Sequence, residues 1–153
     1  MQLHKNFVIL ISKGANKDMK DKYFKYYNPN PEGHEDACDC VIRALCAVSG
    51  LSWYEVYDKC CEIGRKYGRM PNNSTLKFTK IRNEAFGLEP RVIPTPKKGE
   101  RSMTVQKFCE KHKKGKYILS VANHDVAVVD GKYWDTYESF GRKVYKYYEL
   151  VEA

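Results

Sequence analysis

The hydrophobic pattern of this chain changes its period near Tyr117. Before that residue, apolar side chains recur at the spacing of amphipathic helices, and after it they alternate as they do in half-buried strands. Four strands rich in β-branched and aromatic residues are predicted over residues 117–121, 125–129, 133–137 and 144–150. Because helical patterns come first and consecutive strand patterns follow, the order predicts an α+β domain with an antiparallel sheet rather than a parallel, doubly wound one.

The length of 153 residues and the hydrophobic content of 42% are those of a single folded domain. We expect an N-terminal strand and charged segment at residues 1–25, a mostly helical part at 26–116 and the antiparallel sheet at 117–150. The candidate for the N-terminal strand is the apolar run from Phe7 to Ile11, which is too short for a signal peptide or a membrane span. We therefore expect a cytoplasmic protein that does not associate with membranes.

The chain contains six cysteines, an even number that would suggest disulfides in a secreted protein. Most of them fall on or beside predicted helical core faces, and the expected compartment is reducing. We therefore expect Cys46, Cys60 and Cys109 to be buried and unbridged.

The net charge of +8 raises the question of nucleic-acid binding. The lysines and arginines come as scattered groups, either diluted by acids or placed where loops and helix ends are predicted, which disfavours sequence-specific recognition. Nothing in the sequence predicts an oligomeric state.

Residues 37–50 carry the clearest chemical signal. Asp39 is a favoured N-cap residue, Gly50 is placed to end a helix, and apolar residues recur between them at helical spacing. Cys40 would then be the first helical residue, where unpaired backbone N–H groups and the helix dipole favour the thiolate over the thiol. Cys40 is therefore a candidate nucleophile, and the alternative interpretation is a small buried hydrophobic residue.

Three further helices are predicted, over about residues 52–68, 74–86 and 104–115. Ser52 and Glu55 have the spacing of a capping box, and Ser74 and Thr104 are the predicted caps of the other two helices. Cys60 lies on an apolar stripe and is expected in the core rather than in a metal site. Residues 91–93 could form a short strand.

Asp130-Gly131 is a favoured dipeptide for a type I′ hairpin turn. If it forms the two-residue turn, Val129 pairs with Lys132, and His124 and Asp135 become diagonal neighbours on one face, about 7 Å apart at Cα. The carboxylate could then reach the imidazole. A turn at Gly131-Lys132 would separate the two residues further, and a three-residue loop would put them on opposite faces.

Cys40, His124 and Asp135 are the residue types that nucleophilic thiol catalysis needs. Cys40 would attack, His124 would take its proton or form a thiolate–imidazolium pair, and Asp135 would orient the ring. The alternative use of these side chains is a metal site of Cys38, Cys40, His34 and His124. Because Cys38-x-Cys40 lacks the usual zinc spacing and no second pair follows, we expect no metal and no cofactor.

A resemblance to a known family rests on several short motifs taken together. They are Asp39-Cys40-Val41-Ile42-Arg43-Ala44-Leu45, Ser52-Trp53, Glu55-Val56-Tyr57, Tyr117-Ile118-Leu119, His124, the run from Val126 to Gly131, and Asp135-Thr136. With these motifs the chain resembles the small papain-like cysteine peptidases of bacteria and phages over roughly residues 26–150. The Asp-Cys pair that opens a helix is also similar to the leader-peptide peptidases of bacteriocin exporters.

The resemblance implies a papain-like fold, in which N-terminal helices, the nucleophile helix first, pack on a C-terminal antiparallel sheet. It implies a thiol hydrolase for peptide or isopeptide bonds, or an acyltransferase that uses the same acyl-thioester chemistry. Cys40 would match the nucleophile, His124 the general base and Asp135 the third residue.

One departure from the papain-like pattern concerns the oxyanion hole. Papain-like enzymes usually place a Gln a few residues before the nucleophile, and here no Gln lies between Gln2 and Gln106. The backbone N–H of Cys40 can supply one donor, and Asn30 and His34 are candidates for the second. The missing Gln favours the alternative function, a catalytically inactive papain-like binding module for an acidic protein partner.

Overall fold

The computed structural model describes residues 22–151, which form an α+β domain of four helices and one six-stranded sheet. The helices are α2 (Cys40–Ser49), α3 (Trp53–Tyr67), α4 (Leu76–Ala85) and α5 (Val105–Lys111). The strands are β1 (Phe24–Tyr26), β2 (Leu88–Val92), β3 (Lys116–Val121), β4 (His124–Val129), β5 (Lys132–Asp135) and β6 (Lys146–Leu150). The predicted strand at Phe7 to Ile11 lies outside the described residues.

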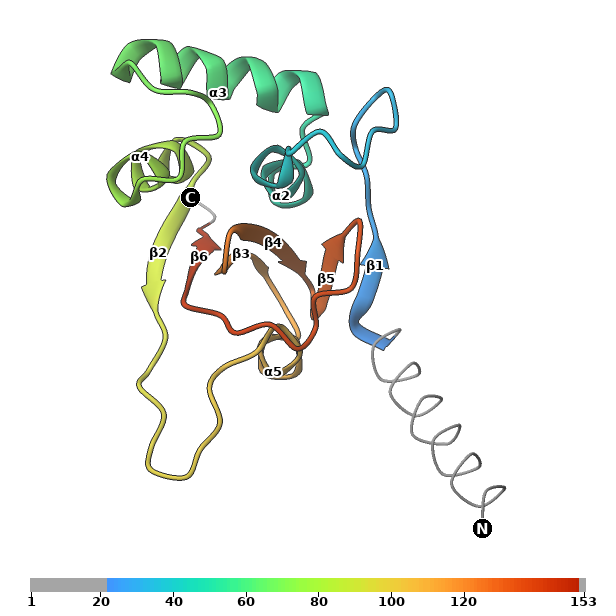
Figure 1. Cartoon of the computed structure of the whole chain (residues 1–153), viewed down its shortest axis with the longest axis vertical. Helices are drawn as coiled ribbons and strands as arrows, with labels where there is room; N and C mark the ends of the chain where they lie inside the picture. The colour runs from blue at the N-terminus through green and yellow to red at the C-terminus, as the bar shows by residue number, and fades with distance from the viewer. Residues whose placement is uncertain (1–21, 152–153) are drawn as a thin grey trace.

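The sheet has the strand order β1-β5-β4-β3-β6-β2 (Figure 1). All neighbouring strands are antiparallel except β1 and β5, which run parallel. The α+β class and the mainly antiparallel sheet agree with the order of helical and strand patterns in the sequence.

The sheet extends beyond the four C-terminal strands that the sequence predicts. β2 comes from the part expected to be mostly helical and forms one edge, and β1 forms the other. No strand was predicted at the residues of β1. The strand is three residues long and depends on partners distant in sequence, including the ring of Tyr133, 5.3 Å from that of Phe24. No local pattern reveals such pairing.

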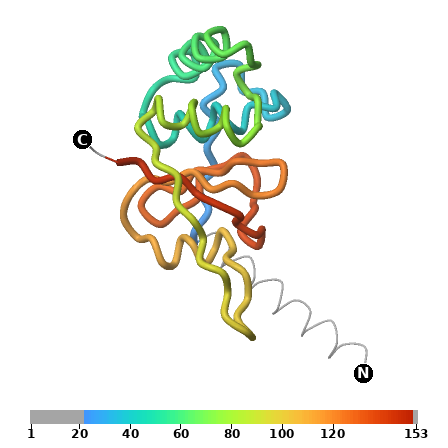
Figure 2. Tube along the Cα trace, turned by 90° about the vertical axis from the view of Figure 1, so that its left-hand side faces the viewer, coloured from blue at the N-terminus to red at the C-terminus, as the bar shows by residue number. Residues whose placement is uncertain are grey.

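The two faces of the sheet bury different sets of side chains, as the two-residue alternation requires. Ile118, Ala127 and Tyr148 pack with the apolar side chains of α2. Leu119, Val126, Val128 and Tyr133 pack on the opposite face with the apolar side chains of α5. Figures 1 and 2 show α2 and α4 on one side of the sheet, with α3 beyond them, and α5 on the other side.

Several local predictions are confirmed. Ser52 and Glu55 form a complete capping box at α3, and the Thr104 hydroxyl accepts a hydrogen bond from the Lys107 backbone N–H at α5. Gly50 and Gly68 end α2 and α3 in the left-handed conformation, with φ angles of 73° and 65°. These signals are local, so tertiary packing has little opportunity to override them.

Asp39 is the N-cap residue of α2, as predicted, but its side chain makes no capping hydrogen bond because its carboxylate contacts Arg43 and Trp53 instead. Two other predicted helix ends are wrong. Thr75 rather than Ser74 occupies the N-cap position of α4. The helix α5 ends at Lys111, before the predicted stop at Gly115.

The β4–β5 hairpin has the predicted register, with Val129 opposite Lys132. The turn residues Asp130 and Gly131 have φ angles of 48° and 81°, and positive values at both positions are those a type I′ turn requires. The hairpin places His124 at the start of β4 and Asp135 at the end of β5.

The described cysteines are all free, and Cys46, Cys60 and Cys109 are buried as expected. Within residues 22–151, none of the helices combines the length and the apolar character that a transmembrane span requires.

Candidate active site

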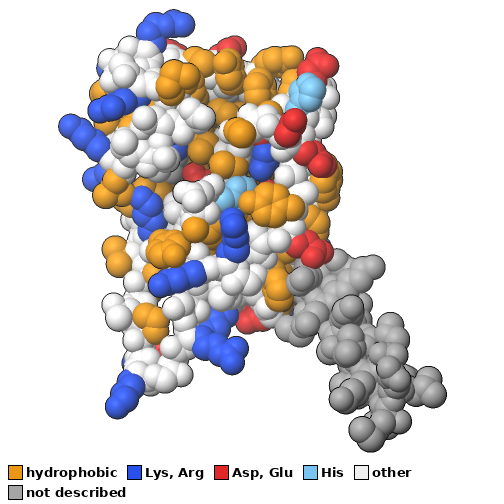
Figure 3. Space-filling model, in the orientation of Figure 1, with side chains coloured by type: hydrophobic (Ala, Val, Ile, Leu, Met, Phe, Trp, Pro, Cys, Tyr) orange, Lys and Arg blue, Asp and Glu red, His pale blue; other side chains and the backbone are white. Residues whose placement is uncertain are grey.

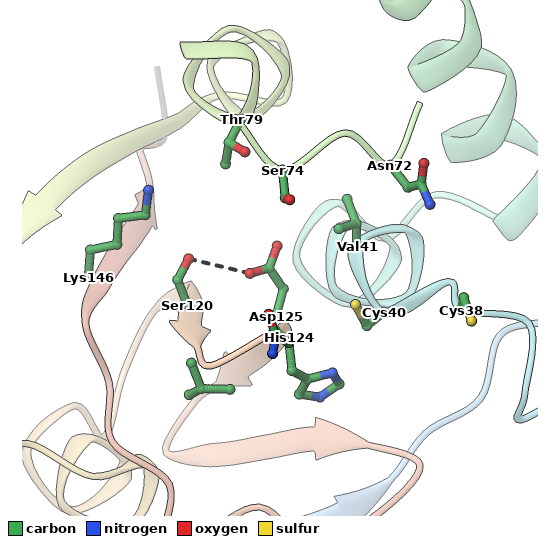
Figure 4. A pocket seen from close by; sticks show the side chains of 12 residues that line it. Cys38, Cys40, Val41, Asn72, Ser74, Thr79, Ser120, His124, Asp125 and Lys146 are labelled. Atoms are coloured by element: carbon green, nitrogen blue, oxygen red, sulfur yellow. Dashed lines mark hydrogen bonds between the residues drawn. The ribbon is translucent and has the colours of Figure 1, made fainter. Parts of the chain in front are cut away.

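Cys40 is the first residue of α2 and is half-buried. Every residue from Val41 to Val48 is buried, which fixes the N-terminal end of the helix against the sheet. Cys40 and His124 line the same pocket, which has a volume of about 410 Å³. Figure 4 shows their side chains close together on one wall of this pocket. The structure therefore brings the candidate nucleophile and the candidate base together from residues far apart in the chain.

His124 is hydrogen-bonded to Asp135 as the hairpin register predicts. Its Nε2 lies 2.5 Å from Asp135 Oδ2, and the two residues are 8% and 2% exposed. The other carboxylate oxygen accepts a hydrogen bond of 2.7 Å from the backbone N–H of Thr136. Because Asp135 occupies Nε2, Nδ1 is the ring nitrogen left to exchange a proton with Cys40.

The surroundings of His124 favour its charged form. Burial alone would lower the pKa of the imidazole, but the hydrogen bonds with Asp135 and with Cys40 outweigh it and raise the pKa to about 9. The ring is therefore largely an imidazolium near neutral pH. A cation beside the sulfur and a helix N-terminus are the surroundings in which nucleophilic cysteines are found.

Arg43 connects the start of α2 to the His124 partner. Its Nη1 pairs with Asp39 Oδ1, and its Nη2 lies 3.3 Å from Asp135 Oδ1. Asp39 in turn accepts a hydrogen bond of 2.8 Å from the Trp53 indole N–H. These charged groups are buried but paired, as buried charges must be to avoid a large desolvation cost.

The pairing of Arg43 with Asp135 was not predicted from the sequence. The available signal was a charged residue on a helix whose other side chains between Val41 and Val48 are apolar, with an aspartate four residues before it. That spacing allows the Asp39–Arg43 pair. It does not reveal Asp135, which is 92 positions away in the chain.

The two predicted oxyanion donors lie in a neighbouring pocket rather than in the one that holds Cys40. Asn30 uses its side-chain N–H in a contact of 3.4 Å with Asp39 Oδ2. The His34 side chain is 63% exposed and lies 4.0 Å from Asp36. The amide side chains that line the Cys40 pocket belong to Asn72 and Asn123, which sequence reasoning did not select.

The rest of the Cys40 pocket is mostly polar. Its lining includes Ser74, Thr79, Ser120, Asp125 and Lys146 (Figure 4). The Ser120 hydroxyl donates a hydrogen bond of 3.3 Å to Asp125. Among residues 22–151, no three His, Cys, Asp or Glu side chains are grouped so that they could hold a metal ion.

Comparisons with protein-family models, with curated proteins and with solved structures found no match to this chain. What the site does must therefore be inferred from its own geometry and chemistry.

Proposed function

We propose that this protein is a cysteine peptidase-like thiol hydrolase that acts on peptide or isopeptide bonds. The observation that carries the proposal is the buried hydrogen bond of 2.5 Å between His124 and Asp135, beside a cysteine at a helix N-terminus. Cys40 is the nucleophile, His124 the general base and acid, and Asp135 the residue that orients the ring. A papain-like arrangement of the domain belongs to the same proposal.

The reaction proceeds in two halves. The Cys40 thiolate attacks the carbonyl carbon, and the His124 imidazolium gives its proton to the departing amine as the C–N bond breaks. This leaves an acyl thioester on Cys40 and a neutral imidazole. His124 then takes a proton from water, the hydroxide attacks the thioester, and the released Cys40 thiolate and the imidazolium are restored.

The tetrahedral intermediates need hydrogen-bond donors for their oxyanion. The backbone N–H of Cys40 has no partner within α2, because the first N–H groups of a helix lack one, and it supplies one donor. Asn72 is our candidate for the second, since its amide side chain lines the pocket on the α2 side (Figure 4). It takes the place that the sequence analysis gave to Asn30 or His34.

The test is cleavage of a mixed peptide library, followed by mass spectrometry, with the wild-type protein and Cys40→Ala. We expect the wild type to cleave a subset of peptides and Cys40→Ala to cleave none. Cys61→Ala is the matched control, because Cys61 is also half-exposed but lies outside the pocket, and it should cleave the same subset. Absence of cleavage by the wild type, or equal cleavage by Cys40→Ala, would favour the non-catalytic binding module.

A further inference from the structure

A second pocket, with a volume of about 480 Å³, lies beside the one that holds Cys40. Its walls come from the first turns of α3, the start of α2 and the loops around residues 30–38 and 70–72. Trp53, Tyr54 and Tyr57 form an aromatic wall. The ring of Trp53 stacks on that of Tyr57, with centroids 5.0 Å apart and an angle of 10° between the planes, and meets Tyr54 edge-on. We call this the aromatic pocket.

Large apolar side chains are left exposed around the aromatic pocket. Met70 is 69% exposed, Tyr54 56% and Tyr57 41%. Figure 3 shows hydrophobic side chains gathered over α3 at the top of the molecule. A cluster of exposed large apolar groups in a concave site is typical of a surface that binds another molecule.

The aromatic wall of this pocket offers mainly apolar contact to a ligand. The Trp53 indole N–H is already satisfied by Asp39, so its remaining ring surface offers only apolar contact. None of the described residues that line the pocket is a lysine or an arginine, although the chain has a net charge of +8. The lining includes the carboxylates of Glu32 and Asp39, of which Asp39 is paired with Arg43, so an acidic group gains nothing there and an apolar group matches the aromatic wall.

The aromatic pocket is continuous with the site of Cys40. Cys38 and Asn72 line both pockets, and Cys38 is two residues before Cys40. Cys38 has a φ angle of 53°, a left-handed conformation that residues other than glycine seldom adopt and that clusters at functional sites. An extended peptide advances about 3.3 Å per residue. When the reacting carbonyl of a bound peptide lies at Cys40, a nearby side chain of that peptide therefore lies over the wall that Cys38 and Asn72 form between the two pockets.

We propose that the aromatic pocket binds a large aromatic or aliphatic side chain of the peptide that reacts at Cys40. This inference rests on the proposed function and names its substrate class. The Cys40 pocket is polar and would not select such a side chain, whereas the aromatic wall would.

The test uses the full-length Cys40→Ala protein, so that a bound peptide is not consumed. It compares a capped heptapeptide of Ala, Ser and Gly with a central Phe and the same peptide with Ala in place of Phe. Binding is followed by NMR through the indole N–H signals of Trp53 and Trp134. Trp134 lies on β5, outside the aromatic pocket, and serves as the internal control.

We expect the Phe peptide to bind at least about tenfold more tightly than the Ala peptide, because burial of an aromatic side chain contributes that much or more. It should shift the Trp53 signal and leave the Trp134 signal in place. Equal affinities for the two peptides, or a Trp53 signal that does not move, would overturn the proposal.

Two variants distinguish binding in the aromatic pocket from nonspecific binding to exposed apolar side chains elsewhere on the surface. Tyr54→Ala combined with Met70→Ala should remove most of the preference for Phe. Tyr67→Ala removes a tyrosine that is 46% exposed at the end of α3, outside the pocket, and should keep the preference. An equal loss of the preference for the Phe peptide in both variants would contradict binding of the Phe side chain in the aromatic pocket.

Cleavage of the same peptides by the wild-type protein distinguishes this proposal from the proposed function. Preferential binding of the Phe peptide without cleavage of any peptide would support the aromatic pocket as a binding site and contradict the proposed hydrolase function. Cleavage without any preference for a large apolar residue near the scissile bond would support the hydrolase and overturn the pocket.

Discussion

Arg43 Nη2 lies 3.3 Å from Asp135 Oδ1, while the other oxygen of the same carboxylate is hydrogen-bonded to His124. The guanidinium on α2 is thus paired with the carboxylate that is hydrogen-bonded to the candidate base on the sheet. Asp39, the residue before Cys40, pairs with the same guanidinium. Buried charges next to Cys40 and His124 therefore connect the helix and the hairpin.

Replacement of Arg43 should lower the free energy of unfolding. Arg43→Gln would leave Asp39 and Asp135 as buried carboxylates without their cation, and breaking such a pair typically lowers the free energy of unfolding by about 3–5 kcal/mol. Urea denaturation measures the loss. The control is Arg65→Gln, an exposed arginine in the last turn of α3, which should change the free energy by less than about 1 kcal/mol. Similar small losses in both variants would show that Arg43 does not support the site.

The raised pKa of His124 predicts how stability depends on pH. The pKa is about 6.5 in the unfolded chain and about 9 in the folded protein, so the folded state binds the proton more tightly. The stabilisation is fully present below pH 6.5 and is lost as the pH rises toward 9, by roughly 3 kcal/mol at most. Urea denaturation at pH 6 and pH 9 should show this fall in the wild type and a smaller fall in Asp135→Asn, which lacks the charge that raises the pKa. An equal fall in both proteins would be inconsistent with this pairing.

The thiols should differ widely in reactivity toward iodoacetamide. Burial raises the pKa of Cys46 and of Cys109 to about 12 and that of Cys60 to about 11, so these thiols should stay unmodified in the folded protein. Cys40, beside an imidazolium and a helix N-terminus, should react at pH 7 about tenfold faster than the exposed Cys38. Peptide mapping by mass spectrometry gives the rates. Faster modification of Cys38 than of Cys40 would argue against an activated nucleophile.

Asn72 should contribute to the rate through the oxyanion. Asn72→Ala is expected to lower kcat by about 100-fold or more, since removal of one oxyanion donor typically costs that much. Ser74→Ala, which alters the same pocket without removing an amide, is the control and should have a much smaller effect. Steady-state kinetics on a cleaved peptide measures both, and equal effects would remove Asn72 from the oxyanion hole.

The parts of the site that could be predicted are those set by local sequence. His124 and Asp135 were placed on one face because the Asp130-Gly131 turn determines the register of the hairpin. Cys40 was placed at a helix start because apolar spacing and Gly50 mark the helix locally. These rules concern neighbours in the chain, and the structure follows them.

The remaining parts depend on how α2 packs against the sheet. The Asp39 side chain was predicted to cap α2, but its carboxylate is hydrogen-bonded to Arg43 and Trp53 instead of to a backbone N–H of the helix. Asn72 reaches the Cys40 pocket from the loop between α3 and α4, and β1 joins the sheet by parallel pairing with β5. Apart from the Asp39–Arg43 pair, whose members are four residues apart, these contacts join residues that come together only on folding.

The most direct test of the account is the pH dependence of kcat/KM for a cleaved peptide, measured for the wild type and for Asp135→Asn. A thiolate–imidazolium pair predicts a bell-shaped profile, in which the acid limb reports formation of the thiolate and the basic limb loss of the imidazolium proton. Burial lowers the pKa of His124, but Asp135 and Cys40 together raise it to about 9. The account therefore predicts a basic limb near pH 9 in the wild type and at lower pH in Asp135→Asn, which lacks the charge of Asp135. A basic limb at the same pH in both proteins would contradict the assignment of Asp135 as the partner of His124 in catalysis.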